Sequence, residues 1–160
     1  MRSGTPYRVA YVIGELGKGG AEYQLHELLR HLDRTLFEPR VFVLAPGGWW
    51  TEPIRALGVV VEEMPRRGSA DLNRLTRLRA AVRAFAPHVL HTILWSANSY
   101  GRLAAIGLGI PVVVAAERNA VPRPAWQVWA GRMLEGVTDA HLVNCEAVAA
   151  LLASRERVAR

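Results

Sequence analysis

Short apolar runs rich in β-branched residues alternate with longer amphipathic segments along this sequence, and the alternation constrains the fold more than any other feature. Several runs, such as "PVVVAAE" at 111–117, are apolar almost throughout. Strands of this kind are typical of a sheet with helices on both faces, because neither side of the strand then meets water. The sequence therefore predicts an α/β fold: a Rossmann-like, doubly wound, mostly parallel sheet with helices on both faces.

The predicted elements follow one another without an internal repeat or a low-complexity linker. Strands are expected at residues 7–14, 39–45, 59–64, 88–93, 111–117 and 140–145. Helices are expected near residues 21–32, 51–57, 71–86, 97–108, 125–135 and 146–153. In the third helix, Asp71 is the predicted N-cap and Pro87 the predicted stop signal.

The length of the chain predicts one domain at 1–160, because 160 residues with 51% apolar content are enough for one core. No segment reaches the roughly 18 consecutive apolar residues of a membrane-spanning helix, and the first apolar stretch is too short for a signal peptide. We therefore expect a cytoplasmic protein. The single cysteine, Cys145, excludes an internal disulfide, and the sequence predicts no metal site.

The formal net charge of +6 comes almost wholly from arginine, because Lys18 is the only lysine. A basic chain favours anionic partners, which include phosphorylated ligands, nucleic acid and acidic membrane surfaces. The sequence contains no recognised nucleic-acid-binding motif, so we expect no nucleic-acid partner.

The glycine-rich stretch "GELGKGGAEYQL" at 14–25 joins the first predicted strand to the first predicted helix. It is not a P-loop, because Lys18 is followed by Gly19 where that motif needs Ser or Thr. It does not fit the dinucleotide pattern GxGxxG, because Glu22 stands at the third glycine position. Two interpretations stay open: free amides around Gly20 bind an anionic oxygen, or the glycines only permit a sharp turn.

Three stretches of the chain resemble one family in the expected order. "GKGGAEYQLHELLRHL" is similar to the GGAE loop and first helix of the retaining GT-B glycosyltransferases of family GT4. "APHVLHTILWSANSYGRLAAIGLGIPVVVAAERN" and "TDAHLVNCEAVAALL" are similar to later segments of the same family. The resemblance extends over roughly residues 7–153.

This resemblance implies that residues 1–160 are the acceptor-binding N-terminal domain of a hexosyltransferase-like enzyme. A C-terminal domain, in cis or in trans, would hold a UDP- or GDP-linked sugar, with no other cofactor in this chain. The sugar would be transferred with retention to a glycan or lipid-linked acceptor. Gly19 and Gly20 carry over as contacts of the donor diphosphate. The family's EX7E carboxylates belong to the C-terminal half, so we expect this chain alone to be inactive.

The resemblance also implies roles for residues around the fourth strand. His91 matches the family's histidine at the end of that strand and would be catalytic. Trp95, Ser96 and Asn98 would line the acceptor side, with Trp95 stacking on a sugar ring. Judged from the residues alone, a lone histidine is more often packed at a strand end, so both interpretations of His91 stay open.

The loop after the fifth strand departs from the commonest pattern of the family. Many members have a histidine there, in a "TxHG"-like segment, whereas this chain reads "AAERN". The resemblance implies that Glu117 holds an acceptor hydroxyl, that Arg118 binds a phosphate and that Asn119 belongs to the same acceptor-side loop. An ion pair that braces the loop is the alternative.

Three hypotheses on partners complete the prediction. Trp49 and Trp50, with Arg66, Arg67 and the basic helix at 71–86, are a candidate patch for an anionic membrane surface; the alternative is a turn beside a solvated helix face. A stand-alone Rossmann-like module that binds an anionic ligand or a protein without catalysis is the alternative to a transferase. An isolated domain would expose its cleft face, so we expect self-association.

Overall fold

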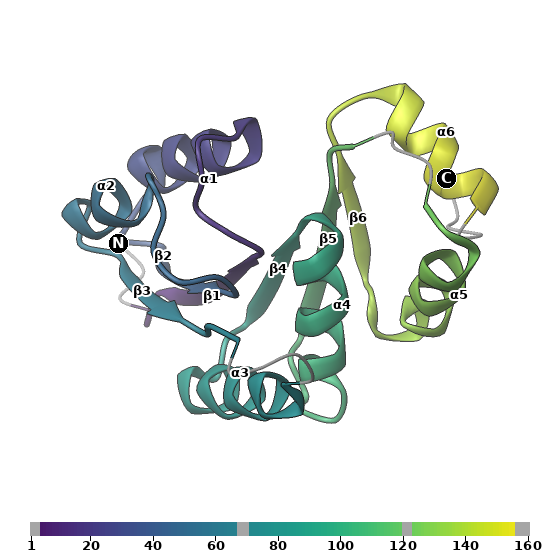
Figure 1. Ribbon diagram of the computed structural model, residues 1–160. Helices are drawn as coiled ribbons and strands as arrows, with labels where there is room; N and C mark the ends of the chain where they lie inside the picture. The colour runs from purple at the N-terminus through teal and green to yellow at the C-terminus, as the bar shows by residue number, and fades with distance from the viewer. Residues whose placement is uncertain (1–3, 67–70, 120–122, 156–160) are drawn as a thin grey trace.

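A six-stranded parallel sheet forms the centre of the computed structural model, which describes residues 4–66, 71–119 and 123–155 (Figure 1). The strand order is β3-β2-β1-β4-β5-β6, and every pairing is parallel. The strands are β1 (Tyr7–Ile13), β2 (Phe37–Val43), β3 (Val60–Glu63), β4 (Val89–Ile93), β5 (Val112–Glu117) and β6 (Ala140–Val143). The predicted doubly wound sheet is confirmed.

The two faces of the sheet are covered by different helices, because alternate side chains of a strand point to opposite faces. On one face, Tyr11 and Ile13 of β1 share a core with helices α1 and α2. On the other face, Ala10 and Val12 share a second core with helices α3 and α4. The helices are α1 (Gly20–His31), α2 (Thr51–Ala56), α3 (Leu72–Phe85), α4 (Leu94–Ala105), α5 (Ala125–Met133), the 3₁₀ helix η1 (Glu135–Val137) and α6 (Glu146–Arg155).

Both predicted ends of α3 are confirmed. The carboxylate of Asp71 accepts a hydrogen bond from the amide of Arg74 at 3.1 Å, which caps the first turn of the helix. At the other end, Ala86 adopts a left-handed conformation with φ of 48°, and Pro87 follows. This sharp ending delivers the chain directly into β4.

The start of α4 differs from the prediction of a helix at 97–108. The helix begins at Leu94, immediately after β4, and ends at Ala105. Leu94 has a φ of 69°, a left-handed conformation that is costly for a branched side chain. This one residue turns the strand into a helix without a loop. Trp95 and Ser96 therefore belong to the first turn of α4.

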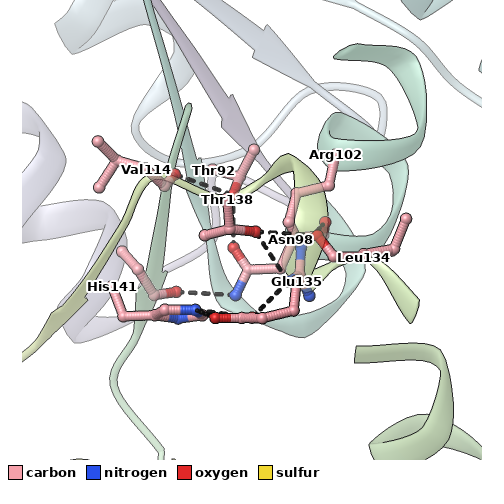
Figure 2. Close-up of polar contacts among 9 residues, drawn as sticks. Thr92, Asn98, Arg102, Val114, Leu134, Glu135, Thr138 and His141 are labelled. Atoms are coloured by element: carbon pink, nitrogen blue, oxygen red, sulfur yellow. Dashed lines mark hydrogen bonds and ion pairs between the residues drawn. The ribbon is translucent and has the colours of Figure 1, made fainter. Parts of the chain in front are cut away.

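A network of buried polar contacts attaches α4 to the sheet (Figure 2). The hydroxyl of Thr92 in β4 donates to Asn98 Oδ1 at 2.6 Å, and Asn98 Nδ2 donates to the carbonyl of Ala116 in β5 at 3.0 Å. Gly101 permits this approach, because a Cβ there would lie 2.3 Å from Thr92 Cγ2. Asn98 thus joins α4 to two neighbouring strands.

The same network continues from Asn98 to Arg102, which is only 2% exposed. Arg102 Nε donates to the carbonyl of Asn98 at 3.0 Å, and Nη1 donates to Thr138 Oγ1 at 3.2 Å. Glu135 lies 3.9 Å from the guanidinium and 3.0 Å from His141 Nε2 in β6 (Figure 2). The charge of Arg102 is therefore compensated inside the protein, as a buried charge must be.

None of the helices in the described part of the chain has the length and hydrophobicity to cross a bilayer. The described residues also contain no group of His, Cys, Asp and Glu side chains placed to hold a metal ion.

Asn98→Ala should lower the free energy of unfolding by about 1–3 kcal/mol, because the Thr92 hydroxyl and the Ala116 carbonyl lose a buried partner. Denaturation in urea measures the effect. Ser99→Ala is the matched control: its hydroxyl bonds only to the carbonyl of Trp95 in the same helix, so its effect should stay within about 0.5 kcal/mol. If the two variants have the same free energy of unfolding, the Asn98 side chain does not stabilise the attachment of α4 to the sheet.

Candidate functional site

The carboxyl ends of the strands meet at one edge of the sheet, because all the strands run parallel. The strand order reverses its direction between β1 and β4, which lie side by side although the first connection from β1 leads to β2. Ligands of doubly wound sheets bind at such a switch point, outside the carboxyl ends of the strands. The segments that follow β1, β4, β5 and β6 therefore contain the candidate site.

A cavity of about 370 Å³ opens at this edge, and we call it the edge cavity. Its walls come from the glycine-rich loop, the start of α1 and α4, and the segments after β5 and β6. The described lining residues are Gly19, Gly20, Ala21, Glu22, Gln24, Leu94, Arg118, Asn119 and Asn144. The structure therefore brings the glycine loop and the segment at 118–119, which are about a hundred residues apart, to one cavity.

The glycine loop provides backbone rather than side chains to the edge cavity. Gly19 is the N-cap of α1 in an extended conformation and makes no side-chain cap, so amides of the first helical turn lack intrahelical partners. A Cβ at Gly19 would lie 2.1 Å from the Glu22 carboxylate, whereas a Cβ at Gly20 would meet nothing within 4 Å. A side chain at Gly19 would therefore have to displace the Glu22 carboxylate, whereas Gly20 leaves space for a ligand.

Arg118 gives the edge cavity a positive charge. Burial lowers the pKa of its guanidinium, which nevertheless stays charged, as arginine does throughout the ordinary pH range. Its buried Nε has no hydrogen-bond partner among the described residues. Together with the helix start, whose dipole also favours anions, this charge suits a phosphate or another anion.

Glu117 lies in an environment that the sequence did not indicate. It is 3% exposed and forms an ion pair with Arg123. Its Oε1 also accepts from the amide of Arg118 at 3.3 Å. The carboxylate therefore braces the loop through Arg123 and not through an ion pair with Arg118. Glu117 is not among the described lining residues of the edge cavity, and its acceptor role stays a prediction. Asn119 is exposed and does line this cavity.

His91 lies within β4, where its neighbours in the sheet are Tyr11 and Val114. Its ring packs on Tyr11 at 5.4 Å between centroids, and its Nε2 is buried without a partner. Burial, and to a smaller extent the charge of Arg118, lowers the pKa of His91 to about 4. The ring is therefore uncharged at neutral pH. It is not among the described lining residues of the edge cavity, and its catalytic role stays a prediction.

The three predicted acceptor residues of α4 lie in three different environments. Trp95 packs edge-on against Trp126 of α5 at 6.2 Å, with the Arg123 guanidinium 4.9 Å from its ring centre. Asn98 is buried and its amide is bonded within the protein (Figure 2). Ser96 alone faces a polar cavity. The structure thus offers Ser96 to a ligand and gives Asn98 a structural role.

A second cavity of about 350 Å³ adjoins the first, and we call it the arginine cavity. It shares Glu22 and Leu94 with the edge cavity. Its described lining residues are Gly14, Glu15, Glu22, Leu44, Ala45, Pro46, Arg66, Arg74, Leu94 and Ser96. Both carboxylates and guanidinium groups are present, so it suits a polar molecule with many hydroxyl groups.

Among the polar side chains that line the edge cavity, the sequence interpretation missed three: Glu22, Gln24 and Asn144. Asn144 directly follows β6, so its position at the carboxyl end of a predicted parallel strand was a usable signal. Glu22 belongs to the quoted glycine motif but was considered only as a departure from a dinucleotide pattern. Gln24 carries no signal in the sequence beyond its helical position.

Comparison with known proteins gives one family and several structures. The family model for the glycosyl transferase 4-like domain matches residues 19–160. HepE from Anabaena, solved with UDP, is 13% identical with a TM-score of 0.77; the alignment covers 96% of this chain and 43% of HepE. HepE has also been solved with UDP and glucose. No curated protein matches the sequence.

Two further structures have the same fold. The lipopolysaccharide outer core galactosyltransferase WaaB is 12% identical with a TM-score of 0.65, over 92% of this chain and 42% of WaaB. MurG from Acinetobacter baumannii is 15% identical with a TM-score of 0.63, over 88% of this chain and 41% of MurG. This chain spans less than half the length of each of the three proteins.

The buried ring of His91 should make stability depend on pH. Its pKa is about 4 in the folded chain against 6.5 for an ordinary imidazole, so between these values only the unfolded chain binds the proton. The stabilisation is complete above about pH 6.5 and is lost as the pH falls toward about 4, by up to about 3 kcal/mol. Urea unfolding across this range measures it.

His91→Phe, which fills similar space and leaves no buried nitrogen, should flatten this dependence. His31→Gln is the control, because the His31 side chain is 70% exposed, and it should keep the dependence of the parent chain. An unchanged slope in His91→Phe would show that other groups cause it.

Proposed function

The chain belongs to the glycosyl transferase 4-like domain family, and on this premise we propose that it is the acceptor-binding domain of a retaining glycosyltransferase. The observation that supports this proposal most directly is the edge cavity, where the glycine loop at the start of α1 and Arg118 line the same space. The resemblance noted in the sequence gives the same family, and the GT-B fold of the structural neighbours agrees with it.

The proposed reaction transfers a hexose or a related sugar from a UDP- or GDP-linked donor to a glycan or lipid-linked acceptor. A second domain, in cis or in trans, holds most of the donor. The amides at Gly19 and Gly20 and the guanidinium of Arg118 meet its diphosphate. The presence of UDP in a HepE structure supports the choice of a nucleotide-linked donor.

Stabilisation of the leaving diphosphate is the main contribution of this chain to the reaction. Charge builds up on the diphosphate as the bond to the sugar breaks, and fixed donors directed at that charge lower the barrier. Holding acceptor and donor in line contributes the rest of the effect, because it replaces a chance encounter. The buried environment of Arg118 strengthens its interaction with such an anion.

The acceptor is assigned to the arginine cavity and to the polar residues between the two cavities. Ser96 and Asn119 are positioned to hydrogen-bond its hydroxyl groups. Glu22 is the carboxylate that lines both cavities in the described part of the chain. His91 is uncharged at neutral pH, so its proposed contribution is a hydrogen bond rather than a charge.

Gly20→Val should abolish transfer while leaving the fold intact, because the added methyl groups enter open space at the edge cavity. Transfer is measured with radiolabelled UDP- and GDP-sugars on the chain joined to a donor domain, and we expect a loss of roughly 100-fold or more. Gly136→Val is the matched control, since Gly136 also has open space but lies in η1.

The same assay tests the remaining assignments. His91→Ala should also lose activity, and the anomeric configuration of the product, measured by NMR, should equal that of the donor. Normal turnover by Gly20→Val and His91→Ala would remove both residues from the site. An inverted product would contradict the retaining assignment.

A further inference from the structure

An apolar groove of about 470 Å³ lies between α4 and α5, outside both polar cavities. We call it the tryptophan groove. Its described lining residues are Trp95, Ser96, Ser99, Tyr100, Leu103, Trp126, Trp129, Ala130, Met133 and Leu134. None of these side chains is charged, and eight of them are apolar or aromatic.

Helix α5 exposes the largest apolar side chains of this groove instead of burying them. Trp126, Trp129 and Met133 are 63%, 64% and 65% exposed. Their spacing of three and four residues places them on one side of the helix, whereas Gly131 and Leu134 are buried. Exposed apolar side chains that gather in this way indicate a surface that contacts another apolar phase.

The exposed charge on the two helices that form the groove is positive. Neither α4 nor α5 contains an aspartate or a glutamate, and each contains one arginine. Arg132 is exposed next to Met133. Arg79 reaches the end of α4, where it donates to the carbonyl of Ala104 at 2.8 Å. Arg102 of α4 is buried, and Glu135, which follows Leu134, is paired with His141. Within the described residues of α4 and α5, the exposed charge is therefore that of Arg132.

We propose that the tryptophan groove docks the protein on an anionic membrane surface. Tryptophan rings favour the interface between lipid headgroups and hydrocarbon, and arginines near the surface attract acidic headgroups. Trp126, Trp129 and Met133 enter the interface, and Arg132 lies among the headgroups. The proposal does not depend on the proposed transferase reaction, because it rests on a different surface.

This surface differs from the membrane patch expected from the sequence at Trp49 and Trp50, with Arg66 and the basic helix at 71–86, which stays an untested prediction. Trp50 is half-buried and packs against His26, with 4.7 Å between ring centroids. Trp49 is exposed, but Lys18 lies 4.0 Å above its ring. Arg67, also part of that expected patch, lies outside the described residues.

Two routes connect the tryptophan groove with the chemistry at the sheet edge. Ser96 lines both the groove and the arginine cavity. Trp95 lines the groove and carries Arg123 over its ring, and Arg123 is the ion-pair partner of Glu117. A membrane bound at the groove therefore lies next to the cavity that would receive a headgroup-linked molecule.

The experiment is flotation of the whole chain with vesicles of phosphatidylglycerol and phosphatidylcholine, and with vesicles of phosphatidylcholine alone. We expect binding to the anionic vesicles that weakens with added salt. The double variant Trp126→Glu/Trp129→Glu should lose it to the level of the zwitterionic vesicles. Arg132→Gln should weaken partition about fivefold, which corresponds to about 1 kcal/mol for one arginine.

The matched control is Trp49→Glu/Leu36→Glu, which makes the same change of charge at side chains that are 61% and 54% exposed. It should float almost like the parent chain. Circular dichroism confirms that each variant is folded. If the double variant of α5 is unfolded, Arg132→Gln and Met133→Gln decide the question.

Three outcomes would overturn the proposal. In the first outcome, the parent chain fails to float with anionic vesicles. In the second, the control variant loses binding as fully as the α5 variant. In the third, light scattering without lipid detects a dimer that Trp126→Glu/Trp129→Glu dissociates, and neither protein floats. That last result would identify a second copy of this chain as the occupant of the groove.

Discussion

The burial of the Arg102 side chain, which belongs to α4, is the constraint on which the half of the sheet formed by β4, β5 and β6 depends. A charged side chain that is 2% exposed is tolerated only if its donors are occupied. Asn98 meets that demand from α4 itself, and Glu135 and Thr138 meet it from the segment of η1 (Figure 2). The segment of η1 must therefore hold its place for α4 to be stable. Because α4 follows β4 directly, the same network fixes Leu94 and with it the wall of both polar cavities.

The sequence predicted the sheet well, because the signal for a doubly covered strand is local. Each strand is an apolar run of its own, and each helix has its own period, so no knowledge of distant partners is needed. The early start of α4 was missed because only Leu94 marks it, and its left-handed φ depends on tertiary packing. No sequence rule predicts such a conformation for a leucine.

The candidate site was predicted less completely, since partners far apart in the chain decide which side chains are free. Arg118 and Asn119 were placed correctly at the sheet edge by the ends of parallel strands. The buried contact of Asn98 could not be predicted, because its bond to the Ala116 carbonyl exists only after β4 and β5 pair. The ion pair of Glu117 could not be predicted for a similar reason: its partner is Arg123, beyond the loop, whereas the sequence drew attention to the adjacent Arg118.

Leu94 lines both the edge cavity and the arginine cavity, and its backbone is held between a paired strand and a helix. A loop residue at this place would move aside for ligands of different sizes. This residue has no such freedom, because Ile93 is fixed in the sheet and the helix starts at once. Leu94 therefore separates the two cavities at a fixed place in the backbone. Any molecule that occupies both cavities must pass this side chain.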